Sequence, residues 1–179
     1  MQTMANNLRR IMFTAACAML IGIAGCASSP TTGYAFGSSY RDDVSSVAVP
    51  IFENDSFERA VEFELTDALV KEIEARTPYK VMTATRADTI LIGRITKIQR
   101  DVVSRSPLTG LNEEVVYRVS IDFEWSDLRT GRTLVRREAF EGQGVYHPSR
   151  PIGNPSELGA FAAVQQLASD IVDQMRADW

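Results

Sequence analysis

Cys26 has the setting with the clearest chemistry in this chain. It follows Ile23-Ala24-Gly25, which closes an uncharged apolar run that begins just after Arg9 and Arg10. Basic residues, a short apolar run and small side chains ahead of a cysteine are the layout of a lipoprotein signal peptide. We therefore expect cleavage before Cys26 and diacylation of its sulfur, with palmitate among the acyl chains.

Two other interpretations of this segment are an ordinary signal peptide and a transmembrane helix that contains a cysteine. The apolar run from Ile11 to Ile23 is 13 residues long, whereas a membrane-spanning helix needs about 20. Acyl chains anchor a protein firmly, because each buried methylene contributes about 0.8 kcal/mol. Ala27 stands where an aspartate would, in many bacteria, retain the protein in the inner membrane. We therefore expect an outer-membrane protein that faces the periplasm.

Residue types that support catalysis or metal binding are few. His147 is the only histidine, and no second histidine or free thiol would accompany it after processing. A metal site or a nucleophile–base pair needs such a partner. Gly142-Gln143-Gly144 lacks the third glycine and the following helix of a dinucleotide-binding turn, and we interpret it as a weakened strand end. The sequence therefore predicts a protein that is not an enzyme and has no cofactor or metal.

The size and charge of the processed chain indicate one acidic domain. It would have 154 residues, enough for a single core. Loss of Arg9 and Arg10 would take the net charge from −4 to −6, which argues against a nucleic-acid-binding protein, because such proteins present a basic face. Residues 26–33 are mostly small and polar and contain a proline, as in a flexible tether. The folded domain would cover residues 34–179.

The first part of this domain has the pattern of a strand, a helix and a strand. Residues 44–52 are apolar and β-branched, which predicts a buried strand. Asp55 or Ser56 would cap a helix over residues 57–76, whose apolar side chains form one stripe. A short strand over 79–83 would then pair in parallel with the first strand through a right-handed crossover.

Three longer strands would follow. Residues 88–103 change phase near Thr96, which indicates a β-bulge. Residues 114–125 alternate strictly between apolar and polar side chains, so that one face of that strand is core and the other is solvated. A hairpin containing Gly131 would return the chain antiparallel over 134–146.

A second helix would complete the domain, with Asn154 as its N-cap and Pro155 in the first position, which needs no N–H. Its predicted apolar face consists of Leu158, Phe161, Val164, Ala168, Ile171, Val172, Met175 and Trp179. Two helices and a sheet with one polar face predict an α+β fold. The expected architecture is a two-layer α/β sandwich, with both helices packed on one mixed sheet of about four to five strands.

The ordered features of the chain resemble a known family. The segments that carry the resemblance are the lipobox at Cys26 and residues 33–36, 47–54, 63–69 and 87–93. They are similar to the lipopolysaccharide-assembly lipoproteins of the LptE type over residues 26–179. The family implies a lipoprotein that plugs the outer-membrane barrel LptD, helps that barrel fold, and contacts lipopolysaccharide on its way to the outer leaflet. Of the functional positions, only Cys26 can be matched to a family motif.

A second interpretation comes from another class. Residues 47–54, followed by a long helix, are also similar to the opening of the secretion-channel lipoproteins CsgG and PelC and of the TolB N-terminal domain. Those proteins form rings or bind other envelope proteins. An oligomer of many identical copies would favour this ring-forming or scaffold protein, and a one-to-one complex with a large barrel would favour the LptE interpretation.

Arginines are the candidates for contact with lipopolysaccharide, because a guanidinium fork suits phosphate. The six candidates are Arg100, Arg105, Arg129, Arg132, Arg136 and Arg137. The leucines of the loop 106–111 would lie against acyl chains. If the strands flank a common sheet, some of these arginines would face one side, and the alternative is an ordinary solvated surface.

Phe63 and Val70 are the candidates for contact with a protein partner. They lie seven residues apart, on the side of the first helix opposite its main apolar stripe. A second apolar line on a surface helix needs another layer of protein or an outside partner. The two alternatives are burial against the aromatic residues of segment 34–40 and contact with the barrel.

Overall fold

The computed structural model describes residues 39–148 and 155–176. The predicted signal peptide, the predicted tether, Asn154 and Trp179 lie outside the described residues. Neither described helix combines the length and the apolar composition that a membrane crossing requires.

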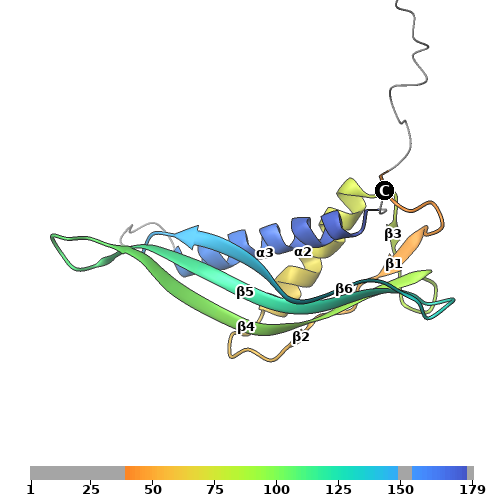
Figure 1. Ribbon diagram of the computed structural model, residues 1–179, viewed down its shortest axis with the longest axis horizontal. Coiled ribbons are helices and arrows are strands. Elements are labelled where there is room, and N and C mark those ends of the chain that lie inside the picture. Colours follow the sequence, from red (N-terminus) through yellow and green to blue (C-terminus); the bar gives the residue numbers. More distant parts are fainter. Residues whose placement is uncertain (1–38, 149–154, 177–179) are drawn as a thin grey trace, which may run out of the picture. The chain divides into compact units, whose positions relative to one another are not determined.

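The described chain forms one mixed sheet of six strands (Figure 1). The strands are β1 (Ser46–Ala48), β2 (Glu53–Asn54), β3 (Lys80–Val81), β4 (Thr89–Arg105), β5 (Asn112–Asp127) and β6 (Thr133–Tyr146). Their order is β3-β1-β4-β5-β6, and β2 also pairs with β4. The pairs among β1, β2, β3 and β4 are parallel, and the pairs among β4, β5 and β6 are antiparallel. The predicted parallel pairing of the first and third of these strands, the hairpin containing Gly131 and the mixed sheet are confirmed.

Two helices, α2 (Val61–Arg76) and α3 (Pro155–Gln174), cover one face of this sheet (Figure 1). The centre of the core is β5, where every second side chain from Val115 to Trp125 is buried. This confirms the prediction from strict alternation, because side chains along a strand point to opposite faces. The bulge predicted near Thr96 is also confirmed, since the register between β4 and β5 shifts between Ile95 and Lys97. The α+β two-layer prediction is therefore correct.

The first predicted strand is wrong in its extent. Pairing with β4 stops after Ala48 and resumes at Glu53, so residues 44–52 do not form one strand. Pro50 lies in the gap and has no N–H to give to a neighbouring strand. Ile51, next to it, is exposed although its sequence pattern places it with buried Val47.

Helix α2 begins four residues later than predicted. Its N-cap is Ala60, which has a left-handed φ of 77° and makes no side-chain cap hydrogen bond, so neither Asp55 nor Ser56 caps the helix. The Asn54 side chain instead accepts the N–H of Ser56 at 2.8 Å and closes a turn ahead of the helix. Phe57 is consequently fully exposed, whereas the stripe from Val61 to Ile73 is buried as predicted.

Helix α3 lies very close to β6, because two glycines of that strand leave room for the helix. A Cβ atom at Gly144 would overlap the backbone of Gly159, and one at Gly142 would overlap the side chain of Leu167. The interpretation of these glycines as a weakened strand end is therefore wrong. They are sites of close approach between a strand and a helix.

The predicted apolar face of α3 is confirmed from Val164 to Met175 but is wrong at its start. Leu158 and Phe161 are each 59 % exposed. Helix α2 contacts the second half of α3, where Arg76 of α2 bonds to Ser169 at 2.7 Å. The exposed pair belongs to the first half of α3, away from this contact.

Candidate functional site

The β4–β5 hairpin forms a long arm that extends beyond the helices (Figure 1). Its turn is closed by the N–H of Ser106, which donates to the carbonyl of Leu111 at 2.8 Å, and by the N–H of Gly110, which donates back to Ser106 at 2.9 Å. Gly110 has a left-handed φ of 69°, which glycine adopts without steric cost. We call residues 102–111 the arm tip.

The arm tip exposes several large apolar side chains. Leu108 is 93 % exposed, Leu111 is 61 % exposed and Val103 is 60 % exposed. Val102 is exposed as well. Single apolar residues are ordinary on a protein surface, but four exposed ones within ten residues make the arm tip a candidate surface for contact with an apolar partner.

Arg105 lies within this apolar group. It is exposed, and its guanidinium forms no hydrogen bond or ion pair with a residue that the structure describes. A phosphate could therefore bind it without displacing a carboxylate. The arm tip thus combines an available cation with apolar surface, which is the chemistry that an anionic lipid needs.

Arg100 lies at the base of the arm and is engaged. Its guanidinium is 2.8 Å from a carboxylate oxygen of Glu58 and 5.2 Å from the ring centre of Tyr117. The Tyr117 hydroxyl donates to the other oxygen of Glu58 at 2.6 Å. Burial of Tyr117, together with this hydrogen bond, raises the pKa of the phenol. These contacts hold the loop before α2 against the arm.

Three more of the predicted arginines also have partners. The pairs are Arg129 with Asp127 at 3.4 Å, Arg136 with Glu138 at 3.0 Å, and Arg137 with the Gln174 side chain at 3.0 Å. Arg132 is the one other candidate whose guanidinium forms no hydrogen bond or ion pair with a described residue.

The structure does not bring the six arginines together. Arg105 is opposite Asn112 of β5, whereas Arg136 is opposite Glu124. At about 3.3 Å per residue these two positions lie roughly 40 Å apart. Arg132 follows the β5–β6 turn, at the opposite end of the long strands from the arm tip (Figure 1). Among the six, only Arg105 lies in the apolar arm tip.

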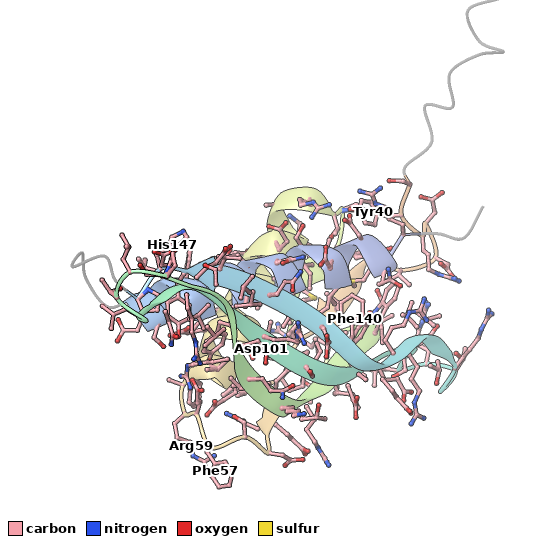
Figure 2. The ribbon with its side chains drawn as sticks, turned by 60° about the vertical axis from the view of Figure 1, so that its left-hand side comes forward. Tyr40, Phe57, Arg59, Asp101, Phe140 and His147 are labelled. Atoms are coloured by element: carbon pink, nitrogen blue, oxygen red, sulfur yellow. The ribbon has the colours of Figure 1, made fainter. Side chains whose placement is uncertain are left out.

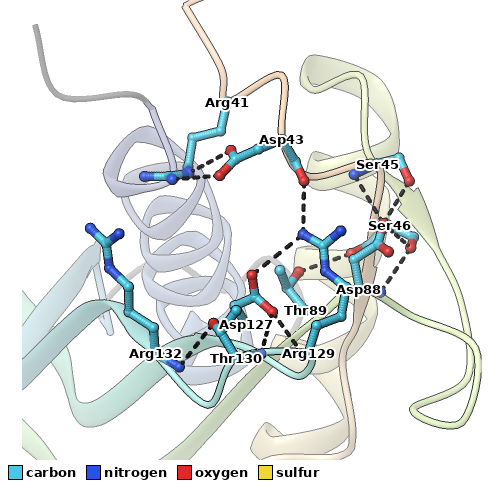
Figure 3. A network of polar contacts seen from close by, with 10 residues as sticks. All are labelled: Arg41, Asp43, Ser45, Ser46, Asp88, Thr89, Asp127, Arg129, Thr130 and Arg132. Atoms are coloured by element: carbon cyan, nitrogen blue, oxygen red, sulfur yellow. Dashed lines mark hydrogen bonds and ion pairs between the residues drawn. The ribbon is translucent and has the colours of Figure 1, made fainter.

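A network of polar contacts at the β5–β6 turn holds the segment that precedes β1 (Figure 3). We call this network the clasp, and its members are Asp43, Ser45, Ser46, Asp88, Asp127, Arg129 and Thr130. The Arg129 guanidinium donates to the carbonyl of Asp43 at 3.0 Å. Asp127 accepts the N–H groups of Arg129 and Thr130 at 2.7 and 3.1 Å. Desolvation opposes ionisation of Asp127, but these hydrogen bonds outweigh it and lower the pKa of the carboxyl.

Asp88 forms the second half of this clasp (Figure 3). One of its oxygens accepts the hydroxyl groups of Ser45 at 2.6 Å and Ser46 at 2.9 Å, and the N–H of Ser45 at 3.1 Å. These hydrogen bonds, the Ser45 hydroxyl first, lower the pKa of Asp88 from 3.8 to about 2. The clasp fixes where the chain enters the fold, at the end of the sheet opposite the arm tip.

The face of the sheet without helices contains a cavity of about 450 Å³. Its lining includes the exposed side chains of Ile51 and Ile92 together with Arg94 and Arg136. Both arginines are paired with carboxylates there, Arg94 with Glu53 at 2.6 Å. This surface is therefore less suited to phosphate than the arm tip, because a bound anion would compete with the carboxylates.

The partner-contact candidates lie on the outer side of α2. Phe63 is 56 % exposed, and Val70 is partly buried. Tyr40, from the segment expected to cover them, packs against Tyr79 with 5.8 Å between ring centres. The rest of that segment lies outside the described residues. Contact of Phe63 and Val70 with a partner therefore stays a prediction.

Sequence reasoning missed Glu58, which anchors the loop before α2. Its two partners follow it by 42 and 59 residues, so only the folded register reveals the contact. His147, which the sequence places in a surface loop, is exposed, and its Nδ1 lies 2.8 Å from the carbonyl of Glu113 (Figure 2).

Comparison with protein families gives a match to the model described as "LptE: Lipopolysaccharide-assembly" over residues 44–179. This match covers the sheet and both helices. No curated protein matches the sequence.

Solved structures show a similar fold at low identity. The hypothetical protein CT253 from Chlamydia trachomatis has a TM-score of 0.54 at 7 % identity, with 75 % of this chain and 99 % of that chain covered. Protein XCC0632 from Xanthomonas campestris has a TM-score of 0.50 at 13 % identity, with 71 % and 82 % covered. The PelC dodecamer from Paraburkholderia phytofirmans has a TM-score of 0.49 at 16 % identity, with 77 % and 93 % covered.

Proposed function

The chain belongs to the LptE lipopolysaccharide-assembly family, and we propose that it is an outer-membrane lipoprotein that contacts lipopolysaccharide while it plugs the barrel LptD and helps that barrel fold. It acts without catalysis, by binding and positioning. Acylated Cys26 anchors it to the membrane, and its folded domain faces the periplasm.

The observation that supports the lipid contact is the position of Arg105 in the arm tip. Lipopolysaccharide carries phosphate groups beside acyl chains, so a complementary surface needs a cation beside apolar side chains. Arg105 offers its full donor set, because it has no partner among the described residues, and Leu108 beside it is almost fully exposed. Arg100, Arg129, Arg136 and Arg137 already have carboxylate or amide partners, and Arg132 lies at the opposite end of the long strands from the arm tip.

Co-purification from native membranes tests the barrel partnership. The full-length chain should be recovered in a one-to-one complex with a single large outer-membrane barrel. Recovery of a ring of identical copies without a barrel would contradict this proposal and would favour the ring-forming or scaffold alternative.

A further inference from the structure

The loop between β2 and α2 displays two side chains outward from a tightly held backbone. Phe57 is 102 % exposed, the largest exposure of any large apolar residue that the structure describes. Arg59, two residues on, is exposed as well, and Figure 2 shows both projecting from the same edge of the molecule. We call residues 55–60 the display loop.

The display loop is held by hydrogen bonds to strands β4 and β5 and by one to Asn54, the residue that precedes it. The N–H of Asp55 donates to the carbonyl of Ile95 in β4 at 2.9 Å. The Asn54 amide donates to the carbonyl of Glu58 at 2.7 Å. The Glu58 carboxylate is tied to the Tyr117 hydroxyl at 2.6 Å, as described above. Glu58 therefore fixes the backbone directly between the two outward side chains.

The backbone of this loop is also strained. Ala60 ends it with a φ of 77°, a left-handed conformation that residues with a Cβ adopt rarely. A loop that only joined a strand to a helix would gain nothing from a fully solvated phenylalanine. Ordering the loop in advance does lower the entropic cost of binding, and buried aromatic and arginine side chains dominate binding energy at protein interfaces.

We propose that the display loop is a protein-docking element that inserts Phe57 into an apolar pocket, with Arg59 pairing with a carboxylate at the rim of that pocket. The residue types favour a protein partner, because an aromatic side chain and an arginine on an ordered backbone are the combination that dominates binding energy at protein interfaces. Arg59 forms no ion pair within the described residues, so its guanidinium can pair with a carboxylate of that protein. The inference rests on the proposed function, under which this partner is the barrel. It places the contact on the loop, separately from the arm tip that serves the lipid.

Two variants of the full-length chain, Phe57→Ala and Arg59→Glu, test the proposal by co-purification with the barrel from native membranes. Each should reduce the recovered barrel about tenfold, a loss typical of interface residues that contribute strongly to binding. Their melting temperatures should stay within about 2 °C of the parent, because neither side chain is packed. Phe161→Ala is the matched control, since it removes another exposed phenylalanine far along the chain.

A photo-crosslinking benzophenone side chain in place of Phe57 gives a second readout. A crosslink to the barrel supports docking, whereas crosslinks only to lipid or to a second copy of this chain overturn it. Equal recovery of the barrel with the parent and both variants, or equal loss with Phe161→Ala, also overturns it. If the parent itself recovers no barrel, the proposed function fails instead, so the two failures are distinguishable.

Discussion

Replacement of Asp88 by asparagine should destabilise the fold in a pH-dependent way. Asparagine keeps the shape of the side chain but removes the negative charge that Ser45 and Ser46 stabilise. A carboxyl whose pKa falls from 3.8 to about 2 gains at most about 2.5 kcal/mol, at roughly 1.4 kcal/mol per pKa unit. Asp88 is partly exposed, so solvent screening reduces the expected loss to about 1 kcal/mol.

The sign of the pH dependence follows from the direction of this pKa. Because folding lowers it, the stabilisation is fully present above pH 4 and is lost as the pH falls towards 2. The difference in free energy of unfolding between the parent and Asp88→Asn should therefore be largest at pH 7 and fall to roughly half by pH 3.

Urea unfolding at several pH values, followed by circular dichroism, measures this difference. Equal free energies of unfolding of the parent and Asp88→Asn at pH 7 would refute a stabilising role for the Asp88 charge. A difference between the two proteins that stays constant from pH 7 to pH 3 would refute an electrostatic cause and would point to altered hydrogen-bond geometry.

Three further outcomes are expected. Gly144→Ala should lower the free energy of unfolding by about 1 to 3 kcal/mol in the same urea assay, because its Cβ would overlap Gly159 of α3; unchanged stability would mean that α3 does not lie so close to β6. Phe63→Asp should change stability by no more than about 0.5 kcal/mol, since Phe63 is 56 % exposed, and a loss of several kcal/mol would reveal burial. Cys26→Ser should abolish metabolic labelling with a fatty acid, and equal label in mutant and parent would exclude acylation at this residue.

The fold could be predicted where one repeating pattern controls an element. The alternation along β5 predicts its buried face because a strand has a period of two residues, and this pattern persists to Trp125. The start of α2 could not be predicted this way. Asp55 and Ser56 have good capping chemistry, but hydrogen bonds of Asn54 draw the chain into a turn and delay the helix until Val61.

The candidate site could be predicted in its residue types but not in its pairings. Arginines are visible in the sequence, whereas their carboxylate partners depend on strand register and on turns. Arg100 and Arg105 look equivalent in the sequence, yet Glu58 binds the first and no described residue binds the second. The glycines of β6 show the same limit, because their role is set by a helix that follows later in the chain.

Binding of lipopolysaccharide to the purified domain without its acyl anchor tests the central claim most directly. Arg105→Glu should weaken binding at least tenfold without lowering the melting temperature, because it places a negative charge beside the phosphate and breaks no internal ion pair. Arg132→Glu is the matched control, since it reverses the charge of another unpaired arginine at the opposite end of the same strands, and it should bind as the parent does. Equal affinity of the parent and Arg105→Glu, or an equal loss in both variants, would contradict a lipid contact at the arm tip.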